Sequence, residues 1–467
     1  MIGVLPGIGP SATIAMLLPL TFNVPPVAAM IMLAGIYYGA MYGGSTTAIL
    51  VNLPGETASV VTCIDGYQMA RHGRAGPALA IAAIGSFFAG TVCTLIIALF
   101  GPVLATLALK LGSPEYFSLM LMGLVAAAVF AHGDMMKSLA MVSLGLMLGV
   151  VGADLDSGVK RYTFGFHELS DGIGVVIIAV GVFAVSEIVG NLGAPEERQI
   201  YTSKVTGLMP TRDDLRQSFG AMCRGTGLGA FFGVLPGTTP AIASFASYMV
   251  EKKLAADPSR FGHGAIEAVA GPESANNADA QCKFIPMLTL GIPASGAMAL
   301  MLGALMIHGI APGPTVMSQQ PGLFWGLIAS MWIGNFMLLL LNLPLVGIWV
   351  RLLKVPYRFL FPAIMLFCAI GVYSTNNSSF EVYLLAVFGV LGVVWRQLEC
   401  SPVPLMLGFV LGPMVEENLR RALQVADGDL SVFVTRPISL AFNVITLVIL
   451  VVVASPLLRK RRGVSMA

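Results

Sequence analysis

The chain has 467 residues, of which 56% are hydrophobic and only 11% are charged, whereas soluble globular proteins carry roughly 25% charged residues. A formal net charge of +2 excludes the broad basic surface that nucleic-acid binding requires, so we predict no nucleic-acid partner. Long apolar runs without β-strand alternation predict an all-α polytopic protein in a lipid bilayer, with about 10 to 12 membrane-spanning helices.

The two halves of the chain repeat one template. Gly3 to Pro10 reads GVLPGIGP, and Gly233 to Pro240 reads GVLPGTTP, at an offset of 230 residues. A second landmark aligns Pro54 with Pro293 at an offset of 239, and a third aligns two His-Gly pairs at an offset of 236. Landmarks in one order at nearly one offset predict an internal structural repeat.

Loop charge predicts that the two halves have opposite orientations, because Lys and Arg accumulate on the cytoplasmic side of a membrane. One loop of the first half holds Arg71 and Arg74, whereas the positions 236 residues later hold Ile307 and Ile310. The next loop reverses the bias, and its basic residues in the second half are Arg351, Lys354 and Arg358. We therefore predict inverted repeats, with these basic loops and the C-terminus in the cytoplasm.

A charged segment bounded by prolines separates the two halves. We predict a first transmembrane repeat over residues 1–193, a cytoplasmic connector over 194–216 and a second transmembrane repeat over 217–467. The apolar stretch Ser218 to Phe232 precedes the second GVLPG, whereas only Met1-Ile2 precedes the first. Unless the repeat is asymmetric, it predicts an N-terminal helix that the chain as written lacks.

Prolines and glycines inside the apolar segments predict helices that break within the membrane, because Pro lacks an N–H and Gly permits a bend. The breaks are paired between the halves, Pro6-Gly7 with Pro236-Gly237 and Pro54-Gly55 with Pro293. Half-helix N-termini direct N–H groups at anionic substrates, and half-helix C-termini direct carbonyls at cations. A single membrane proline often only shapes packing, but this pairing indicates a binding site.

Polar residues gather near the breaks. YGGSTT begins at Tyr42 and leads into Asn52, while PESANN begins at Pro272 and precedes the second break. Hydroxyls and amides bind a carboxylate or Na⁺ without burying an unpaired charge. Among the ionisable residues, Glu273 is the candidate coupling carboxylate because it adjoins two asparagines. Glu187 stands close enough to the connector to reach water.

Catalytic and metal-binding patterns are missing from the sequence. It contains no Gly-Lys pair, and therefore no P-loop, and neither H-E-x-x-H nor G-x-S-x-G. Its cysteines lack C-x-x-C spacing and its histidines lack metal-ligand spacing. We predict no enzyme activity, no cofactor and no metal other than a coupling Na⁺. A gradient-driven carrier fits this pattern, and a passive anion channel or a polytopic membrane enzyme are the alternatives.

Four strings carry a family resemblance: GVLPGIGPSATIAMLLPLTF, YGGSTTAILVNLPGETASVVTCIDGYQMARHGRAGPALA, FGHGAIEAVAGPESANNADA and LGIPASGAMALMLGALMIHGIAPGP. Together they closely resemble the large membrane (permease) subunit of the tripartite tricarboxylate transporters, over nearly the whole chain. The resemblance implies a symporter of the bacterial inner membrane that imports an organic carboxylate with Na⁺ or H⁺. It also implies a periplasmic solute-binding protein and a small four-helix membrane subunit as partners.

The resemblance also implies site residues and exposes departures from the family pattern. Thr238-Thr239 follow the second GVLPG where a Gly is common, and Ala294 stands where the family favours Gly, so we expect both turns to tune the substrate. Family members usually carry a helix ahead of the first GVLPG. The substrate- and ion-binding candidates are Gly7, Gly9, Ser45, Thr46, Asn52, Pro54, Gly55, Gly237, Thr238, Asn276, Asn277, Pro293 and Ser295, with Glu273 as coupling carboxylate.

Overall fold

The computed structural model describes residues 9–52, 54–131, 134–154, 157–190, 207–235, 237–345, 348 and 357–461. In these ranges the regular structure is helical apart from one antiparallel hairpin, formed by β1 (Gly152–Ala153) and β2 (Lys160–Arg161). The predicted all-α fold class is therefore confirmed. The first half contains α1 (Pro10–Leu17), η2 (Leu18–Asn23), α2 (Pro26–Val51), η3 (Thr57–Ser59), α3 (Val60–Arg71), α4 (Ala75–Ala108), α5 (Ser113–Phe130), α6 (Met135–Gly149), η4 (His167–Leu169), α7 (Val175–Ala179), the π-helix η5 (Val180–Val185) and α8 (Ser186–Gly190).

The second half begins inside the predicted connector. Thr211 and Asp214 form a reciprocal capping box, which fixes the N-terminus of the first helix at Arg212. The first part of the predicted connector, residues 194–206, lies outside the described ranges. The helices of this half are α9 (Arg212–Val234), α10 (Pro240–Leu254), η6 (Pro258–Arg260), α11 (Glu267–Cys282), α12 (Phe284–Leu290), α13 (Gly296–Ile307), α14 (Thr315–Gln319), α15 (Pro321–Asn342), α17 (Tyr357–Asn376), α18 (Ser379–Gln397), α19 (Pro402–Val425), α20 (Val432–Thr435) and α21 (Pro437–Arg461).

Several helices have the length and composition of membrane spans. In the described part of the chain, α2, α4, α5, α15 and α18 are long and apolar enough to cross a membrane. Further apolar helical segments of 10–17 residues are Met135–Gly149, Val175–Gly190, Gly296–Ile307, Ile364–Asn376 and Pro437–Val451. Such short segments are expected where membrane helices are broken or stop at mid-depth.

The outer faces of the long helices carry exposed apolar side chains. On α4, Leu99 and Phe100 are 61% and 56% exposed, and on α15 Ile333 is 63% exposed. Soluble monomers rarely expose contiguous apolar patches of more than a few hundred Å². The apolar faces of α4 and α15 are therefore lipid-facing surfaces, as expected of a multi-pass membrane protein.

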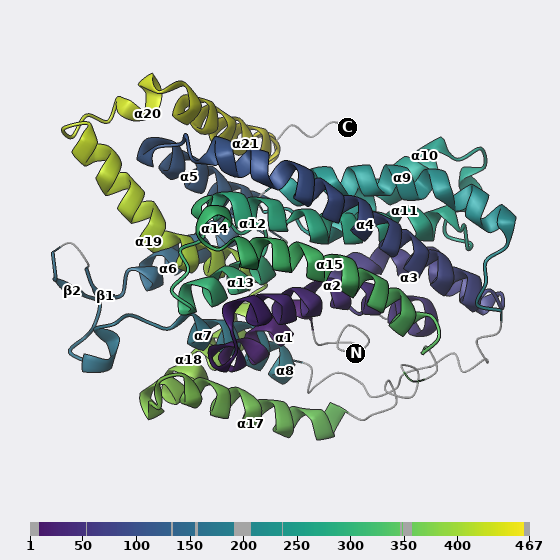
Figure 1. The fold of residues 1–467 in the computed structure, drawn as a ribbon, viewed down its shortest axis with the longest axis horizontal. Coiled ribbons are helices and arrows are strands. Elements are labelled where there is room, and N and C mark those ends of the chain that lie inside the picture. Colours follow the sequence, from purple (N-terminus) through teal and green to yellow (C-terminus); the bar gives the residue numbers. More distant parts are fainter. Residues whose placement is uncertain are drawn as a thin grey trace.

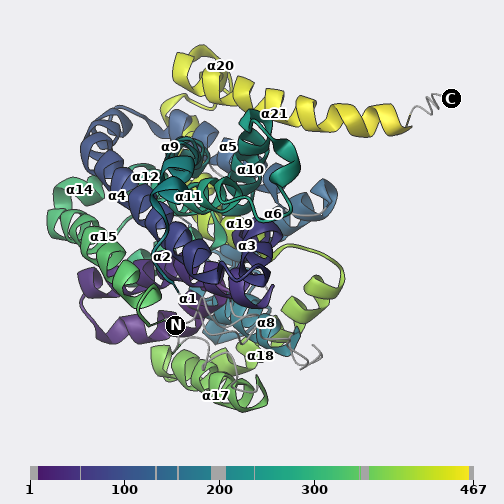
Figure 2. The same cartoon turned by 90° about the vertical axis from the view of Figure 1, so that its right-hand side faces the viewer.

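Figure 1 shows that most of the long helices run roughly along the longest axis of the molecule. The turn between α3 and α4 lies at one end, and the β-hairpin lies at the other. Helix α14, which follows α13, lies toward the hairpin end (Figure 1). Helix α21 packs on α5 and extends away from the other helices (Figure 2).

The centre of the bundle is occupied by α11, a polar helix that is buried on every side. Each residue from Ala268 to Cys282 is buried, and α9, α10, α4, α3 and α2 pack around the helix. Glu273 and Asn276 are each 1% exposed, and Asp279 and Lys283 form a fully buried ion pair. Polar groups inside a membrane protein are expensive unless they are paired or serve a site. The polar residues of α11 therefore indicate a functional site near this helix.

Candidate substrate and ion site

The paired helix breaks have the same backbone construction in both halves. Helix α2 ends before Asn52, which has a left-handed φ of 56°, and α12 ends before Gly291, which has a φ of 71°. Gly and Asn tolerate this conformation best. Both positions are separated by the offset of 239 that relates Pro54 to Pro293.

The helix that follows each break is capped by a side chain at the same offset. The Glu56 carboxylate accepts a hydrogen bond from the Ala58 N–H at 2.6 Å at the start of η3, which continues into α3. The Ser295 hydroxyl accepts one from the Met298 N–H at 3.4 Å at the start of α13. The two breaks are therefore alike in backbone geometry but differ in charge, because only the first carries a carboxylate.

The second GVLPG copy forms the turn between α9 and α10, and the described part of the first copy's motif is the start of α1. Gly237 has a left-handed φ of 81°, and its N–H donates to the Ala294 carbonyl at 3.2 Å, which ties the turn to the other break of this half. The Thr238 hydroxyl donates to the Phe232 carbonyl at 2.7 Å. Gly9 is the N-cap residue of α1.

We expect Gly237→Ala to disrupt this turn. An added Cβ would lie 2.5 Å from the Ala127 N atom, and the φ of 81° costs an L-residue roughly 1–2 kcal/mol by itself. The matched control is Gly309→Ala, because Gly309 has a φ of 68° but no atom within 4 Å of the position that an added Cβ would take. A fluorescence melt of the detergent-solubilised protein should show a clearly larger loss of stability for Gly237→Ala, and equal losses would refute the steric argument.

Four helix N-termini meet at one cavity of about 410 Å³, a volume typical of small-molecule sites. They are the starts of α1, η3, α10 and α13, so both halves contribute. These four starts contribute residues 9–11, 55–57, 237–240 and 294–297 to the lining, which also includes Ser401 at the start of α19. Helix N-termini present unpaired N–H groups and a partial positive charge. The arrangement therefore suits an anion of the size of a small organic acid.

The cavity lining contains two acids. Glu56 and Glu187 both border the cavity, and its described lining includes no Lys, Arg or His. The Glu187 carboxylate accepts a hydrogen bond from the Gly9 N–H at 2.8 Å, so it sits at the N-terminus of α1. Tyr37 also borders the cavity and is 2% exposed, and no described residue forms a hydrogen bond with its hydroxyl.

A second polar cluster lies beside the cavity and centres on Glu273. Its carboxylate accepts hydrogen bonds from the Ser45 hydroxyl at 2.5 Å and from the Thr62 hydroxyl. Asn276, one turn along α11, donates to the Glu56 carboxylate at 3.1 Å. Glu56 therefore borders the cavity and also joins it to the cluster around Glu273.

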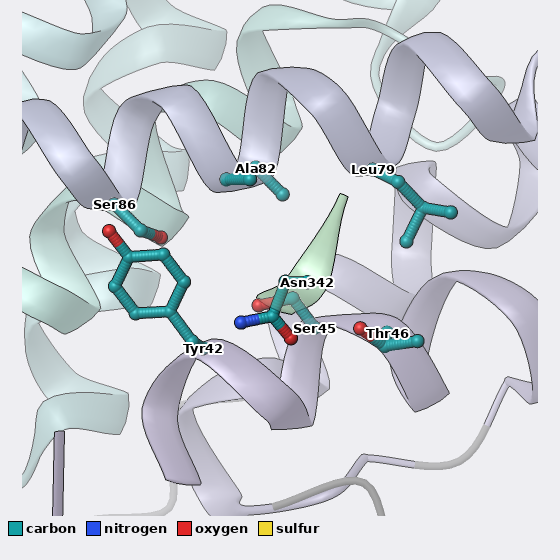
Figure 3. Close-up of a pocket in the computed structure, with 8 residues that line it drawn as sticks. Tyr42, Ser45, Thr46, Leu79, Ala82, Ser86 and Asn342 are labelled. Atoms are coloured by element: carbon teal, nitrogen blue, oxygen red, sulfur yellow. The ribbon is translucent and has the colours of Figure 1, made fainter. Parts of the chain in front are cut away.

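Figure 3 shows a small pocket at this cluster, with Tyr42, Ser45 and Thr46 of α2 facing residues of α4. Its volume of about 10 Å³ is close to the minimum for one water molecule. Ser86 of α4 lines it and accepts a hydrogen bond from the Asn277 amide at 2.7 Å. The pocket therefore offers hydroxyl and amide oxygens next to Glu273, in a space suited to a water or a small cation.

The structure places the predicted site residues in three groups. Those that line the cavity are Gly9, Gly55, Gly237, Thr238 and Ser295. Those in the cluster around Glu273 and its pocket are Ser45, Thr46, Glu273, Asn276 and Asn277. Those that shape the breaks without lining either pocket are Asn52, Pro54 and Pro293. Gly7 lies outside the described residues.

The residues of the cavity lining that sequence reasoning did not select include Tyr37, Glu56, Glu187 and Thr239. The sequence does contain a pattern that indicates Glu56. It lies 239 residues before Ser295, the offset of the repeat, and Ser295 was predicted as a site residue. Glu187 was expected to reach water near the connector; it is half-buried and borders the cavity. No local pattern marks Tyr37, which lies far from both breaks in sequence.

A helical bundle with apolar outer faces, in which broken helices from both halves meet at one cavity, defines a polytopic membrane transport protein. The chain belongs to the Tripartite tricarboxylate transporter TctA family, whose sequence profile matches residues 1–407. The resemblance found in the sequence is thereby confirmed. The family is a transporter family, which agrees with the prediction of a protein other than an enzyme.

Two relatives come from Agrobacterium vitis. One is described as an uncharacterized 52.8 kDa protein in the TAR-I ttuC' 3' region and is 57% identical over 462 residues, covering 99% of this chain and 92% of the relative. The other is described as an uncharacterized protein in the TAR-II ttuC' 3' region and is 57% identical over 234 residues, covering 50% of this chain and 97% of the relative. No solved structure matches the chain.

Proposed function

We propose that this chain is the permease subunit of a secondary transporter that imports an organic di- or tricarboxylate by ion-coupled alternating access. The observation that carries the proposal is the meeting of four helix N-termini, drawn from both halves, at one cavity. N-terminal N–H groups bind carboxylates without a basic side chain, so the substrate can be released as readily as it is bound.

The charge of the cavity supports coupling to a cation. Its described lining holds Glu56 and Glu187 but no basic residue, so an anionic substrate would enter a site that already contains two acids. Burying further unpaired negative charge costs several kcal/mol. Protons on these carboxylates, or Na⁺ bound among the oxygens around Glu273, would remove that cost. We therefore propose that H⁺ or Na⁺ binds together with the substrate.

Helix contacts support the proposal of inverted repeats. Helix α1 of the first half packs against α13 of the second half, and α10 of the second half packs against η3 and α3 of the first. In the same way α4 packs on α11, and α15 packs on α2. The contact between α1 and α13 is the repeat-related counterpart of the contact between α10 and α3. The contact between α4 and α11 is likewise the counterpart of the contact between α15 and α2. Such an exchange is expected when two repeats related by a two-fold axis surround a shared site. The turn between α3 and α4 and its repeat-related counterpart around α14 lie toward opposite ends of the molecule (Figure 1), which favours inverted repeats. Alternating access then moves one group of helices past the other.

The family also suggests the setting in which this subunit works. We propose that a periplasmic solute-binding protein delivers the carboxylate and that a small four-helix membrane subunit completes the complex in the bacterial inner membrane. The turn between α3 and α4, which holds Arg71 and Arg74, would face the cytoplasm together with the C-terminus. The β-hairpin, at the opposite end in Figure 1, would then face the periplasm.

Uptake into proteoliposomes tests the proposal. With both partner proteins present and a Na⁺ or H⁺ gradient imposed, we expect saturable uptake of citrate, malate or succinate that falls at least about tenfold when the gradients are collapsed. Flux that is linear in substrate concentration and indifferent to the gradients would indicate a passive anion channel instead. A chemically altered product would indicate an enzyme, and the absence of uptake of every carboxylate would overturn the proposal.

A further inference from the structure

The N-terminus of α1 carries a carboxylate that belongs to the protein itself. Glu187 lies in α8, 178 residues along the chain from Gly9, and its Oε1 accepts the Gly9 N–H at 2.8 Å. A Cβ added to Gly9 would lie 3.3 Å from the same oxygen, so the carboxylate sits directly against the start of the helix. Both residues border the cavity, and the Glu187 side chain thus occupies a position suited to a substrate carboxylate.

Among the described residues, no carboxylate caps the equivalent helix of the second half. Helix α10 begins after Thr239, whose side chain makes no capping hydrogen bond and whose hydroxyl is buried without a partner. The Tyr37 hydroxyl, also on the cavity wall, lacks a partner although the residue is 2% exposed, and it lies close to Ser295. Buried hydroxyls without partners indicate groups that a ligand would satisfy. A substrate carboxylate therefore has donors at α10 and α13 that do not compete with Glu187.

Glu187 also has an alternative partner outside the cavity. It borders a second cavity of about 500 Å³, which adjoins the first through Phe183, Glu187 and Ser401 and is lined by Arg396 of α18. The Arg396 guanidinium donates to the Glu187 backbone carbonyl at 3.4 Å and attracts its carboxylate. The movement that the exchange of partners requires is a change of the Glu187 rotamer, which turns the carboxylate from the start of α1 toward this guanidinium.

We propose that Glu187 is a tethered competitor of the substrate, which holds the N-terminus of α1 until a substrate carboxylate displaces it toward Arg396. This inference rests on the proposed function, because it assumes that the cavity binds a carboxylate. On binding, the Gly9 N–H donates to the substrate instead of to Glu187, and the freed carboxylate pairs with the Arg396 guanidinium. Glu187 thereby weakens substrate binding and favours release, and it sets the affinity without being required for recognition.

Three variants test this competition by equilibrium binding of radiolabelled citrate, malate and succinate to the purified protein. We expect Glu187→Gln to bind about three- to tenfold more tightly, because a neutral amide competes less well for a helix N-terminus than a carboxylate does. Arg396→Gln should bind more weakly by a similar factor, because the displaced carboxylate loses its partner. The double variant should match Glu187→Gln, because Arg396 acts only through Glu187.

Two further variants separate competition from a structural role. Glu187→Asp keeps the charge on a shorter side chain and should give an intermediate affinity, and it remains informative if Glu187→Gln does not fold. Glu399→Gln removes another acid that lines the second cavity but not the first, and should leave affinity unchanged. Unchanged or weaker binding by Glu187→Gln, or an Arg396→Gln effect that persists in the double variant, would overturn the inference alone. Absence of carboxylate binding by every protein, wild type included, would overturn the proposed function as well.

Discussion

Glu273→Gln should abolish the response of uptake to the ion gradient. The Glu273 carboxylate is 1% exposed and accepts hydrogen bonds from the Ser45 and Thr62 hydroxyls, so it is well placed to hold a cation in the centre of the bundle. A neutral amide neither takes up a proton nor attracts Na⁺. Loss of a charged hydrogen-bonding group costs roughly 1.5–3 kcal/mol, which corresponds to a fall of about ten- to a hundredfold in gradient-driven uptake.

The control for this variant is Glu267→Gln on the same helix. Glu267 is the first residue of α11 and pairs with Arg260 at 3.2 Å; the Arg260 side chain is 46% exposed and the Glu267 side chain 18% exposed. Ion pairs that reach the surface contribute little. Uptake by Glu267→Gln should therefore retain its gradient dependence. Initial rates in proteoliposomes with and without an imposed gradient make the comparison. If Glu273→Gln remained as strongly stimulated by the gradient as wild type, Glu273 would have no part in coupling.

Local rules in the sequence were sufficient to predict the helix breaks near Pro54 and Pro293. Pro and Gly interrupt a helix through their own covalent structure, so the breaks could be read without knowledge of the fold. The structure places left-handed residues at Asn52 and Gly291 at the offset that relates the prolines. Composition was likewise sufficient for the helical membrane class, because the cost of burying charge in lipid acts on the whole chain.

Contacts between distant segments could not be predicted in the same way. The bond between Glu187 and Gly9 joins residues 178 positions apart, and nothing near Glu187 in sequence indicates it. Asp279 and Lys283 have the four-residue spacing of an ordinary solvent-exposed pair, yet both are 0% exposed. The burial of α11 on every side depends on the helices packed around it, and a single sequence does not specify that packing.

The packing of α9 on α11 provides the second large prediction. Gly225, Gly229 and Gly233 recur every four residues along α9 and face α11. A Cβ added at Gly229 would lie 2.2 Å from the Ala275 carbonyl oxygen and 2.7 Å from the Ala278 Cβ. Small residues at this spacing let membrane helices approach until their backbones touch.

Gly229→Val should therefore force the two helices apart. Overpacking a core costs about 1–3 kcal/mol where side chains can adjust, and here the obstacle is the backbone of α11, which adjusts less readily. We expect a large loss of folded protein, measured as the monodisperse fraction in size-exclusion chromatography of the detergent extract. The fraction that does fold should transport poorly, because α11 carries Glu273 and Asn276 and any displacement moves them relative to α2 and α3.

Gly227→Val is the matched control, since it makes the same substitution two residues away on the same helix. No atom lies within 4 Å of a Cβ added at Gly227, so this side of α9 has room for the larger side chain. Both variants change helix propensity equally, and only Gly229→Val meets α11. Near-normal yield and uptake for Gly227→Val, with loss of both for Gly229→Val, would assign the effect to close helix packing. Equal losses would instead assign it to propensity, and the contact between α9 and α11 would then be less intimate than the structure indicates.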